Sequence, residues 1–299
     1  MSKNAQSLYL YSFISLLAFA ANSVLCRIAL KDGYIDATSF TLLRLLSATV
    51  TLFLLIFITQ RKSTSLTFSK VVFKKYWFSS VMLFLYALCF SVAYINLSTG
   101  TGALILFGFV QVTLVIASLF YGHKVDKLTA LGLCIALFGL GYLVYPSLLL
   151  PSFINFILMS LSGIAWGIYT LRGKSSQNPI IDTYYNFLLT LPLITIITIF
   201  MLSSLSVSFY GVILSIISGG VMSALGYALW YNVVKHFTFI QSGVLQLCVP
   251  IFATLAGSII VKEPISLSLC ISTGLILLGI YLTLLAKKRT ANNVNSQRN

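Results

Sequence analysis

The Lys and Arg residues of this chain are sorted into alternate gaps between long apolar stretches. Of its 19 Lys and Arg residues, 15 lie in every second gap or in the two terminal segments. Loops rich in Lys and Arg stay on the cytoplasmic side of a bilayer, so such an alternation fixes the orientation of a multi-span chain. The pattern therefore predicts a membrane protein with both termini in the cytoplasm.

The composition agrees with this topology and excludes a soluble fold. The chain of 299 residues is 59% hydrophobic and 8% charged, whereas soluble domains carry roughly 25% charged residues. The net charge of +14 does not indicate nucleic-acid binding, because the basic residues form short scattered clusters without an aromatic platform. Basic loops held at an anionic inner leaflet explain that charge.

A bilayer span needs about 20 apolar residues, and the chain contains ten such stretches. We predict an all-α membrane protein of ten transmembrane helices. The run Ala18-Phe19-Ala20 resembles a signal-peptidase site, but the apolar segment continues to Leu30, so we expect no cleavage. The predicted spans are residues 8–30, 37–59, 76–97, 102–121, 128–145, 152–171, 180–201, 209–231, 240–261 and 266–286.

The ten spans divide into two sets of five, and because five is odd the second set is inverted in the membrane. This is the inverted-repeat plan of many secondary transporters. With an offset of 140 residues, 102–145 lies over 242–285 and Gly139 meets Gly279. We predict one five-helix repeat over residues 1–147, a second over 148–288, and a polar cytoplasmic tail over 289–299.

Motifs in both halves match a known transporter pattern. They are FTLLRLLSA (40–48), SGIAWG (162–167), GYALWY (226–231), QLCVP (246–250) and KEP (262–264), followed by glycines at 274 and 279. With these motifs the chain resembles the EamA-type branch of the drug/metabolite transporter superfamily. It departs from that pattern at Asn22-Ser23, where Trp-Gly is usual, and at Gly122-His123, where Gly-Glu is usual. The resemblance implies a transporter of the bacterial inner membrane that moves amino acids, nucleosides or other metabolites without ATP.

Arg44 is the one charged residue well inside a predicted span. It lies ~6 Å from the centre of span 2, at 1.5 Å per residue. An Arg at that depth costs at least ~2.5–3.5 kcal/mol on insertion scales, so it should face protein or water. Two roles fit: a clamp for a substrate carboxylate, or a structural Arg bonded to backbone carbonyls or to an acid such as Asp36.

Span 8 carries small and aromatic residues on one helical face. Gly219, Ser223, Tyr227 and Trp230 follow one another at spacings of four, four and three. This face is typical of a solute cavity beside an aromatic wall. Close helix packing through small residues explains the same spacing, with Trp230 as an interfacial anchor.

Span 9 places Gln246 one turn before Pro250. Because proline removes a backbone donor, the carbonyl of Gln246 loses its helical partner, which indicates a gate, a binding element or a purely structural kink. Other polar and aromatic residues within the spans are candidates for the same central cavity, and helix packing is the alternative for each. These candidates are Asn22, Tyr94, Asn96, Gln111, Trp166 and Tyr169.

The five acidic residues all fall at span ends or in loops, so the sequence offers no mid-membrane proton carrier. This favours a facilitator, or coupling through a group near an entrance. We expect Glu263 to pair with Lys262 or to cap the turn at Pro264. No Cys/His spacing indicates a metal, and Gly173-Lys174 lacks the glycines of an ATP-binding loop. We therefore predict no metal and no cofactor.

Together these features predict a secondary transporter of small metabolites, most suited to amino acids or related amphipathic solutes, working by alternating access. Its partners would be the lipid bilayer and the solute, and the resemblance implies that spans 5 and 10 pack together or contact a second copy in a homodimer. A channel or a membrane scaffold is the first alternative. A lipid-modifying enzyme is less favoured, since the two His residues lie 113 positions apart without an acidic cluster.

Overall fold

The computed structural model describes residues 3–59, 69–122, 126–144 and 152–296. Over these residues the backbone is helical apart from short connections and one isolated bridge between Ile35 and Val207. The helices of the first half are α1 Lys3–Lys31, α2 Ala37–Thr59, α3 Lys70–Tyr94, α4 Thr99–Phe120 and α5 Lys127–Val144. His123, one of the departures from the family pattern, lies outside the described residues.

The second half contains more breaks than the first. Its elements are α6 Ser152–Gly173, α7 Pro179–Leu188, α8 Leu191–Phe200, η2 Leu202–Ser204, α9 Phe209–Ile216, η3 Ile217–Ser223, α10 Ala224–Val234, α11 Phe239–Gln246, α12 Val249–Ile260 and α13 Leu267–Ser296. Two breaks stand just before a proline: Pro192 opens α8 and Pro250 opens α12. Proline clashes with the carbonyl four residues earlier, and for Pro250 that residue is Gln246, where α11 ends.

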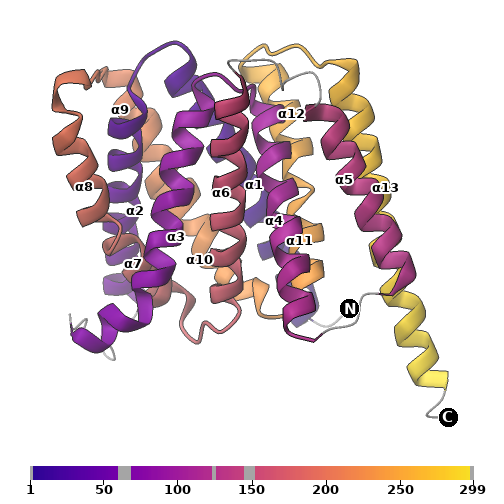
Figure 1. Cartoon of the computed structure of the whole chain (residues 1–299). Coiled ribbons are helices and arrows are strands. Elements are labelled where there is room, and N and C mark those ends of the chain that lie inside the picture. Colours follow the sequence, from indigo (N-terminus) through magenta and orange to yellow (C-terminus); the bar gives the residue numbers. More distant parts are fainter. Residues whose placement is uncertain (1–2, 60–68, 123–125, 145–151, 297–299) are drawn as a thin grey trace.

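Eight helical segments among the described residues are long and apolar enough to cross a membrane. These spans make the chain a multi-pass integral membrane protein. The remaining two apolar helices, Lys127–Gly139 and Leu267–Thr283, are shorter, so the total of ten spans stays a prediction. α13 continues to Ser296, so most of the predicted polar tail is helical. Figure 1 shows α1 beginning and α13 ending toward the same lower side of the bundle.

The helices of the two halves interleave in a reciprocal way. α1 packs against α10 and α12 of the second half, and α6 packs against α3 and α4 of the first. α5 and α13 lie along each other at one side of the bundle (Figure 1). Gly132 of α5 permits this contact, because a Cβ there would lie 2.6 Å from the carbonyl oxygen of Gly279.

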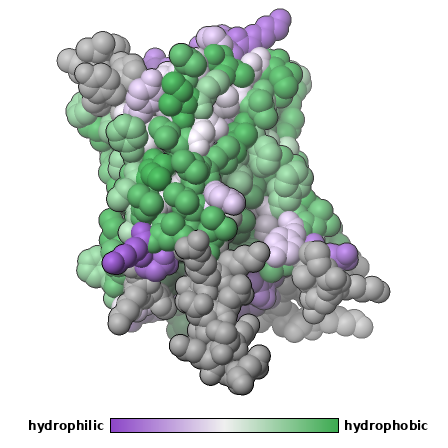
Figure 2. All heavy atoms as spheres, turned by 90° about the vertical axis from the view of Figure 1, so that its right-hand side faces the viewer, coloured by the Kyte–Doolittle hydropathy of each residue, from purple (hydrophilic) through white to green (hydrophobic). Residues whose placement is uncertain are grey.

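Apolar side chains cover the outside of the bundle as well as its core. Figure 2 shows a largely apolar surface on the side formed by α5 and α13, with hydrophilic residues toward its two ends. Phe120, Phe138 and Ile259 are more than two-thirds exposed. Such a surface suits contact with lipid, and the polar groups described below are instead gathered inside the bundle.

Candidate functional site

Arg44 of α2 lies at the centre of the bundle and is 1% exposed. Its Nε donates to Ser223 Oγ at 3.0 Å, and its Nη2 donates to the hydroxyls of Tyr227 at 2.6 Å and Tyr86 at 3.1 Å. The guanidinium also lies over the ring of Phe90, 5.0 Å from its centroid. Its Nη1 has no hydrogen-bond partner among the described residues. Within the described part of the chain, Arg44 is therefore held by neutral groups and not by a carboxylate.

The π-helical segment η3 brings Ser223 to Arg44. Gly219 in this segment packs on the backbone of α2, where a methyl group would overlap the carbonyl oxygen of Arg44. The wider turn of a π-helix is rare and is often found at functional sites. Asn22 of α1 completes the junction by donating to Ser223 Oγ at 3.2 Å and accepting from Ser218 Oγ at 2.7 Å.

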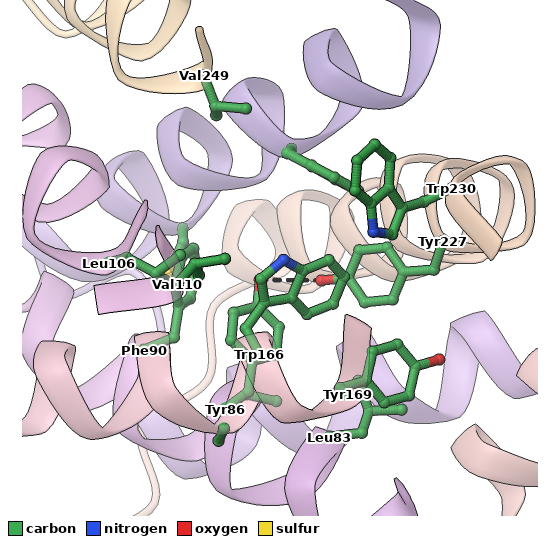
Figure 3. Close-up of a cluster of buried hydrophobic side chains, with 14 of the residues drawn as sticks. Leu83, Tyr86, Phe90, Leu106, Val110, Trp166, Tyr169, Tyr227, Trp230 and Val249 are labelled. Atoms are coloured by element: carbon green, nitrogen blue, oxygen red, sulfur yellow. Dashed lines mark hydrogen bonds between the residues drawn. The ribbon is translucent and has the colours of Figure 1, made fainter. Parts of the chain in front are cut away.

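Aromatic rings from α3, α6 and α10 surround this polar centre. The ring of Trp166 lies 4.6 Å from that of Tyr227 and 4.9 Å from that of Tyr86, between centroids. Figure 3 shows Trp166, Tyr169, Tyr227 and Tyr86 gathered together, with the hydroxyls of Tyr227 and Tyr86 hydrogen-bonded at 2.9 Å. The sequence spacing predicted that Ser223 and Tyr227 share one helical face, and in the structure both side chains contact Arg44.

The remaining predicted residues of the spans differ in whether they contact the Arg44 cluster. Gln246 joins the cluster, because its Oε1 accepts from Trp166 Nε1 at 2.6 Å. Trp230 is buried and donates to Thr170, so it packs inside the bundle and is no interfacial anchor. Gln111 is buried on α4, and its Oε1 has no partner among the described residues.

Two residues of span 3 lie away from the cluster. Tyr94 is buried at the end of α3 and donates to the carbonyl of Thr99, one turn beyond Phe90. Asn96 follows the end of α3, is exposed, and contacts Asn155 at 3.5 Å. The structure does not bring Asn96 to Arg44. In its place it brings Tyr86 and Phe90, which lie eight and four residues before Tyr94 on α3.

Glu263 and Arg27 form an ion pair where α1 and α12 end. Arg27 Nε donates to Glu263 Oε1 at 3.0 Å, and Glu263 Oε2 accepts from the backbone N–H of Thr99 at 2.8 Å. Arg27 Nη1 donates to the carbonyls of Tyr94 at 2.9 Å and Ile95 at 2.7 Å. The expected pairing of Glu263 with its neighbour Lys262 is wrong, because the only ion pair of Glu263 among described residues is with Arg27.

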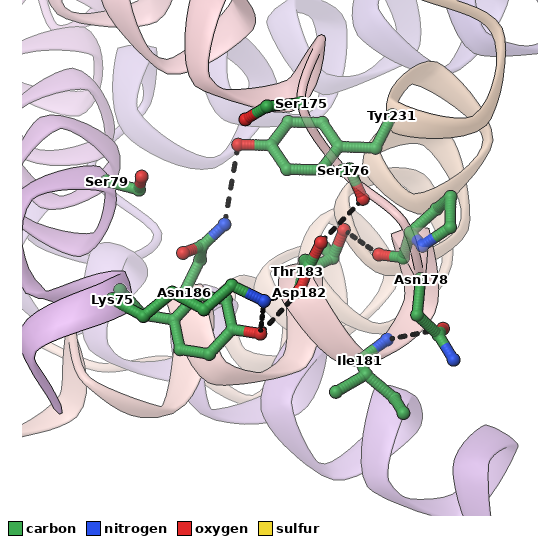
Figure 4. Close-up of polar contacts among 12 residues, drawn as sticks. Lys75, Ser79, Ser175, Ser176, Asn178, Ile181, Asp182, Thr183, Asn186 and Tyr231 are labelled. Atoms are coloured by element: carbon green, nitrogen blue, oxygen red, sulfur yellow. Dashed lines mark hydrogen bonds and ion pairs between the residues drawn. The ribbon is translucent and has the colours of Figure 1, made fainter. Parts of the chain in front are cut away.

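Asp182 forms a second ionic cluster at the opposite, basic end of the bundle. It is 6% exposed and accepts from Tyr76 at 2.5 Å, Ser176 at 2.7 Å and Lys75 at 3.2 Å (Figure 4). A small hollow of about 50 Å³ lies beside these residues and is also lined by Asn186. These three hydrogen bonds to Asp182 hold the start of α3 against the start of α7.

Lys174 lies just beyond the end of α6 at this same end of the bundle. Its Nζ donates to the carbonyls of Val234 at 3.0 Å and of Phe237, and to Ser242 Oγ at 3.3 Å. It makes no ion pair with a described residue, and burial lowers the pKa of Lys174 to about 8.

A model of the EamA-like transporter family matches residues 6–145 and again residues 154–285. The chain belongs to the EamA-like transporter family. This family is part of the drug/metabolite transporter superfamily, so the chain is a membrane transporter, and in a bacterium its place is the inner membrane. The two matches fall in the two halves of the chain, and they span every residue of the Arg44 cluster.

Relatives and one solved structure agree with this assignment. The chain is 40% identical over 275 residues to an uncharacterized protein of Pseudomonas aeruginosa, covering 92% of this chain and 93% of that protein. It is 29% identical over 196 residues to an uncharacterized transporter of Archaeoglobus fulgidus, covering 63% and 68% of the two chains. A crystal structure with 15% identity superposes with a TM-score of 0.73 over 94% of this chain and 98% of that one, which shows a shared fold.

Proposed function

We propose that the protein is a secondary transporter of small metabolites that carry a carboxylate, best suited to amino acids, and that it works by alternating access around Arg44. One observation carries the proposal. Arg44 is buried, and among the described residues its Nη1 has no hydrogen-bond partner and its guanidinium has no carboxylate partner. The site therefore holds a positive charge that a substrate can neutralise.

The contacts of Arg44 favour the clamp over the structural alternative. A structural Arg would fill its donors with backbone carbonyls or with Asp36, but Asp36 instead accepts from the backbone N–H groups of Thr38, Ser39 and Ser206. The partners of Arg44 are neutral hydroxyls. A carboxylate brings an opposite charge and forms two parallel bonds with a guanidinium, a pairing that a neutral hydroxyl does not provide. An entering carboxylate would thus replace the hydroxyls of Tyr86 and Tyr227 and bind Arg44 more strongly than they do.

The walls of the cluster suit the rest of an amphipathic solute. Trp166 and Tyr169 stack on each other, with 5.3 Å between their ring centroids, and rings of this kind bind an ammonium group or an apolar side chain when a solute enters between them. Asn22 and Gln246 supply fixed amide groups on the other sides. Apolar walls with a few directed polar groups are typical of metabolite sites.

Alternating access is supported by breaks in the helices beside the site. The π segment η3 and the interruption between α11 and α12 both lie at residues of the cluster, Ser223 and Gln246. Interrupted helices near the midplane typically form the substrate site of inverted-repeat carriers, around which one bundle of helices moves against the other. We extend the proposal to the cytoplasmic placement of both termini, to Pro250 as a gating kink, and to a homodimer contact through α5 and α13.

Counterflow in proteoliposomes tests the proposal. Purified protein would be offered labelled amino acids, nucleosides and S-adenosylmethionine, with and without a pH gradient. We expect saturable counterflow of a carboxylate-bearing solute, lost in Arg44→Gln and kept in Arg172→Gln, whose side chain is exposed and makes only bonds of 3.4–3.5 Å.

Each rival function has its own outcome in this assay. A channel or scaffold would give unsaturable flux or none, without counterflow. A lipid-modifying enzyme would return a chemically altered lipid. A response to the pH gradient would overturn the facilitator interpretation and direct attention to Asp182 and Glu263, the two acids that the structure places in ionic clusters.

A further inference from the structure

Arg27 and Lys174 make the same kind of contact at opposite ends of the bundle. Arg27, near the end of the first helix of the first half, donates to the last carbonyls of α3. Lys174, just past the first helix of the second half, donates to the last carbonyls of α10 and the turn after it. The last carbonyls of a helix lack helical partners and carry partial negative charge, so both positions favour a cation.

Each of the two sites also contacts the start of the helix that follows, α4 in the first case and α11 in the second. Glu263, bound to Arg27, accepts from Thr99, the first residue of α4. Lys174 reaches Ser242 near the start of α11 and lies over the ring of Phe239, the first residue of α11. Tyr94 and Val234, the last residues of α3 and α10, are 140 positions apart, the same offset that relates Gly139 to Gly279.

One difference separates the two ends. The contact at Arg27 contains a carboxylate, whereas Lys174 has no acidic partner among the described residues. We call the first contact, Arg27 with Glu263, the α1 clasp, and the second, Lys174 with its carbonyls, the α6 clasp. The α1 clasp holds four chain segments, namely α1, the end of α3, the start of α4 and the end of α12, through charge-assisted bonds.

We propose that the α1 clasp and the α6 clasp are the two gates of the transport cycle, and that the ion-paired α1 clasp is the tighter gate. The proposal rests on the alternating access proposed above. Opening the α1 clasp separates α1 from the α3–α4 corner and admits solute toward Arg44. Opening the α6 clasp separates α6 from the α10–α11 corner on the other side.

Helices α1 and α3 connect the α1 clasp to the Arg44 cluster. Tyr86, Phe90 and Tyr94 form one face of α3, and the first two contact Arg44 while the carbonyl of the third is held by Arg27. On α1, Asn22 contacts Ser223 in the cluster, and Cys26 is fully buried between the cluster and the clasp. A solute passing the open clasp therefore meets Cys26 before it reaches Arg44.

Cys26 supplies a native reporter for the α1 clasp. In a protein whose other four cysteines are replaced by serine, a charged membrane-impermeant thiol reagent modifies Cys26 only when that end is open. We expect Glu263→Gln to speed this labelling about tenfold, because it removes the charge from one of the bonds that hold the gate. The increase should occur from one face of the membrane only, the face that also labels a cysteine introduced at Asp32 in the α1–α2 turn.

A double variant distinguishes a gate from a local packing defect. Because only one gate opens at a time, adding Lys174→Gln to Glu263→Gln should return the labelling rate of Cys26 toward that of the parent. Lys262→Gln is the matched control, since Lys262 is exposed and adjacent but is not bonded to Arg27. Arg27→Lys, which keeps the charge, should give an intermediate rate in folded protein, and it replaces Glu263→Gln if that variant does not fold.

Three results would overturn the two-gate proposal. They are an unchanged rate in Glu263→Gln and Arg27→Lys, an equal increase in Lys262→Gln, and an increase from both faces of the membrane. The assay contains no substrate, so it is independent of the transport assay. Loss of counterflow with normal Cys26 labelling would count against the proposed substrate class, while normal counterflow with unresponsive labelling would count against the clasps.

Discussion

The hydroxyl of Tyr227 lies 2.6 Å from Nη2 of Arg44, across 183 residues of sequence. This contact joins α2 of the first half to α10 of the second at the centre of the bundle. It also shows what kind of site the bundle contains, because a neutral hydroxyl occupies the place where a carboxylate would bind more strongly. The predictions below follow from this contact and from the packing that positions it.

Tyr227→Phe should destabilise the substrate-free protein, since a hydrogen bond to a charged group contributes about 1.5–3 kcal/mol. Tyr86→Phe should have a smaller effect, because its bond to Arg44 is longer, at 3.1 Å. Thermal unfolding in detergent measures both. A transported amino acid should raise the melting temperature of Tyr227→Phe more than that of the parent, as its carboxylate fills the vacated place. Equal shifts in the two proteins would mean that the solute does not replace this hydroxyl.

Gly219→Ala should destabilise the protein by roughly 1–3 kcal/mol, the usual cost of overpacking. The added methyl would overlap the carbonyl oxygen of Arg44 and push η3 away from α2. Gly274→Ala is the control, because a Cβ at Gly274 meets nothing within 4 Å. Melting temperatures of the purified variants provide the comparison, and a neutral Gly219→Ala would show that η3 does not need to approach α2 so closely.

Asp36 should make the protein less stable in acid. Burial alone raises the pKa of Asp36, but hydrogen bonds from Ser39, Ser206 and Thr38 outweigh it and lower the pKa below its usual 3.8. A lowered pKa contributes stability that is present above the unfolded-state pKa and is lost as pH falls through the folded-state value. The melting-temperature difference between the parent and Asp36→Asn should therefore be largest at pH 5 and shrink below pH ~3.9. If the melting-temperature difference did not vary with pH, the effect of Asp36→Asn would come from the changed shape of the side chain and not from its lost charge.

The basic loops should lie in the cytoplasm. Intact cells treated with an impermeant thiol reagent should label a cysteine introduced at Asp32 and leave one introduced at Ser175, next to Lys174, unlabelled. Inverted vesicles should give the reverse. Labelling of Ser175→Cys in intact cells would contradict this orientation, because it would place the α6 clasp outside the cell.

The periodic features of the fold are readable from the sequence, and the pairwise ones are not. Apolar length predicts the spans, and the spacing of four predicts that Ser223 and Tyr227 face the same way. A helical period does not say what that face meets. Tyr86 was therefore missed, although it bonds Arg44, and Arg27 was not paired with Glu263 across 236 residues.

Other features depend on local geometry that residue types alone do not reveal. In the π turn of η3, Gly219 and Gly220 pack against α2, whereas isolated glycines in a span predict only close packing. The position of Asn96 was misjudged because α3 ends at Tyr94, and a shift of two residues moves a side chain from the core to the surface. The break at Pro250 was predictable, since it follows from the chemistry of a single residue.

The most direct test of the central claim compares an amino acid that the protein transports with its carboxamide, which has the same shape and no negative charge. Both would be measured as competitors of uptake in proteoliposomes that carry the parent or Arg44→Gln. We predict that the parent prefers the acid by at least tenfold, about 1.4 kcal/mol, and that Arg44→Gln removes this preference. Equal competition by acid and carboxamide in the parent would show that Arg44 is not the carboxylate site.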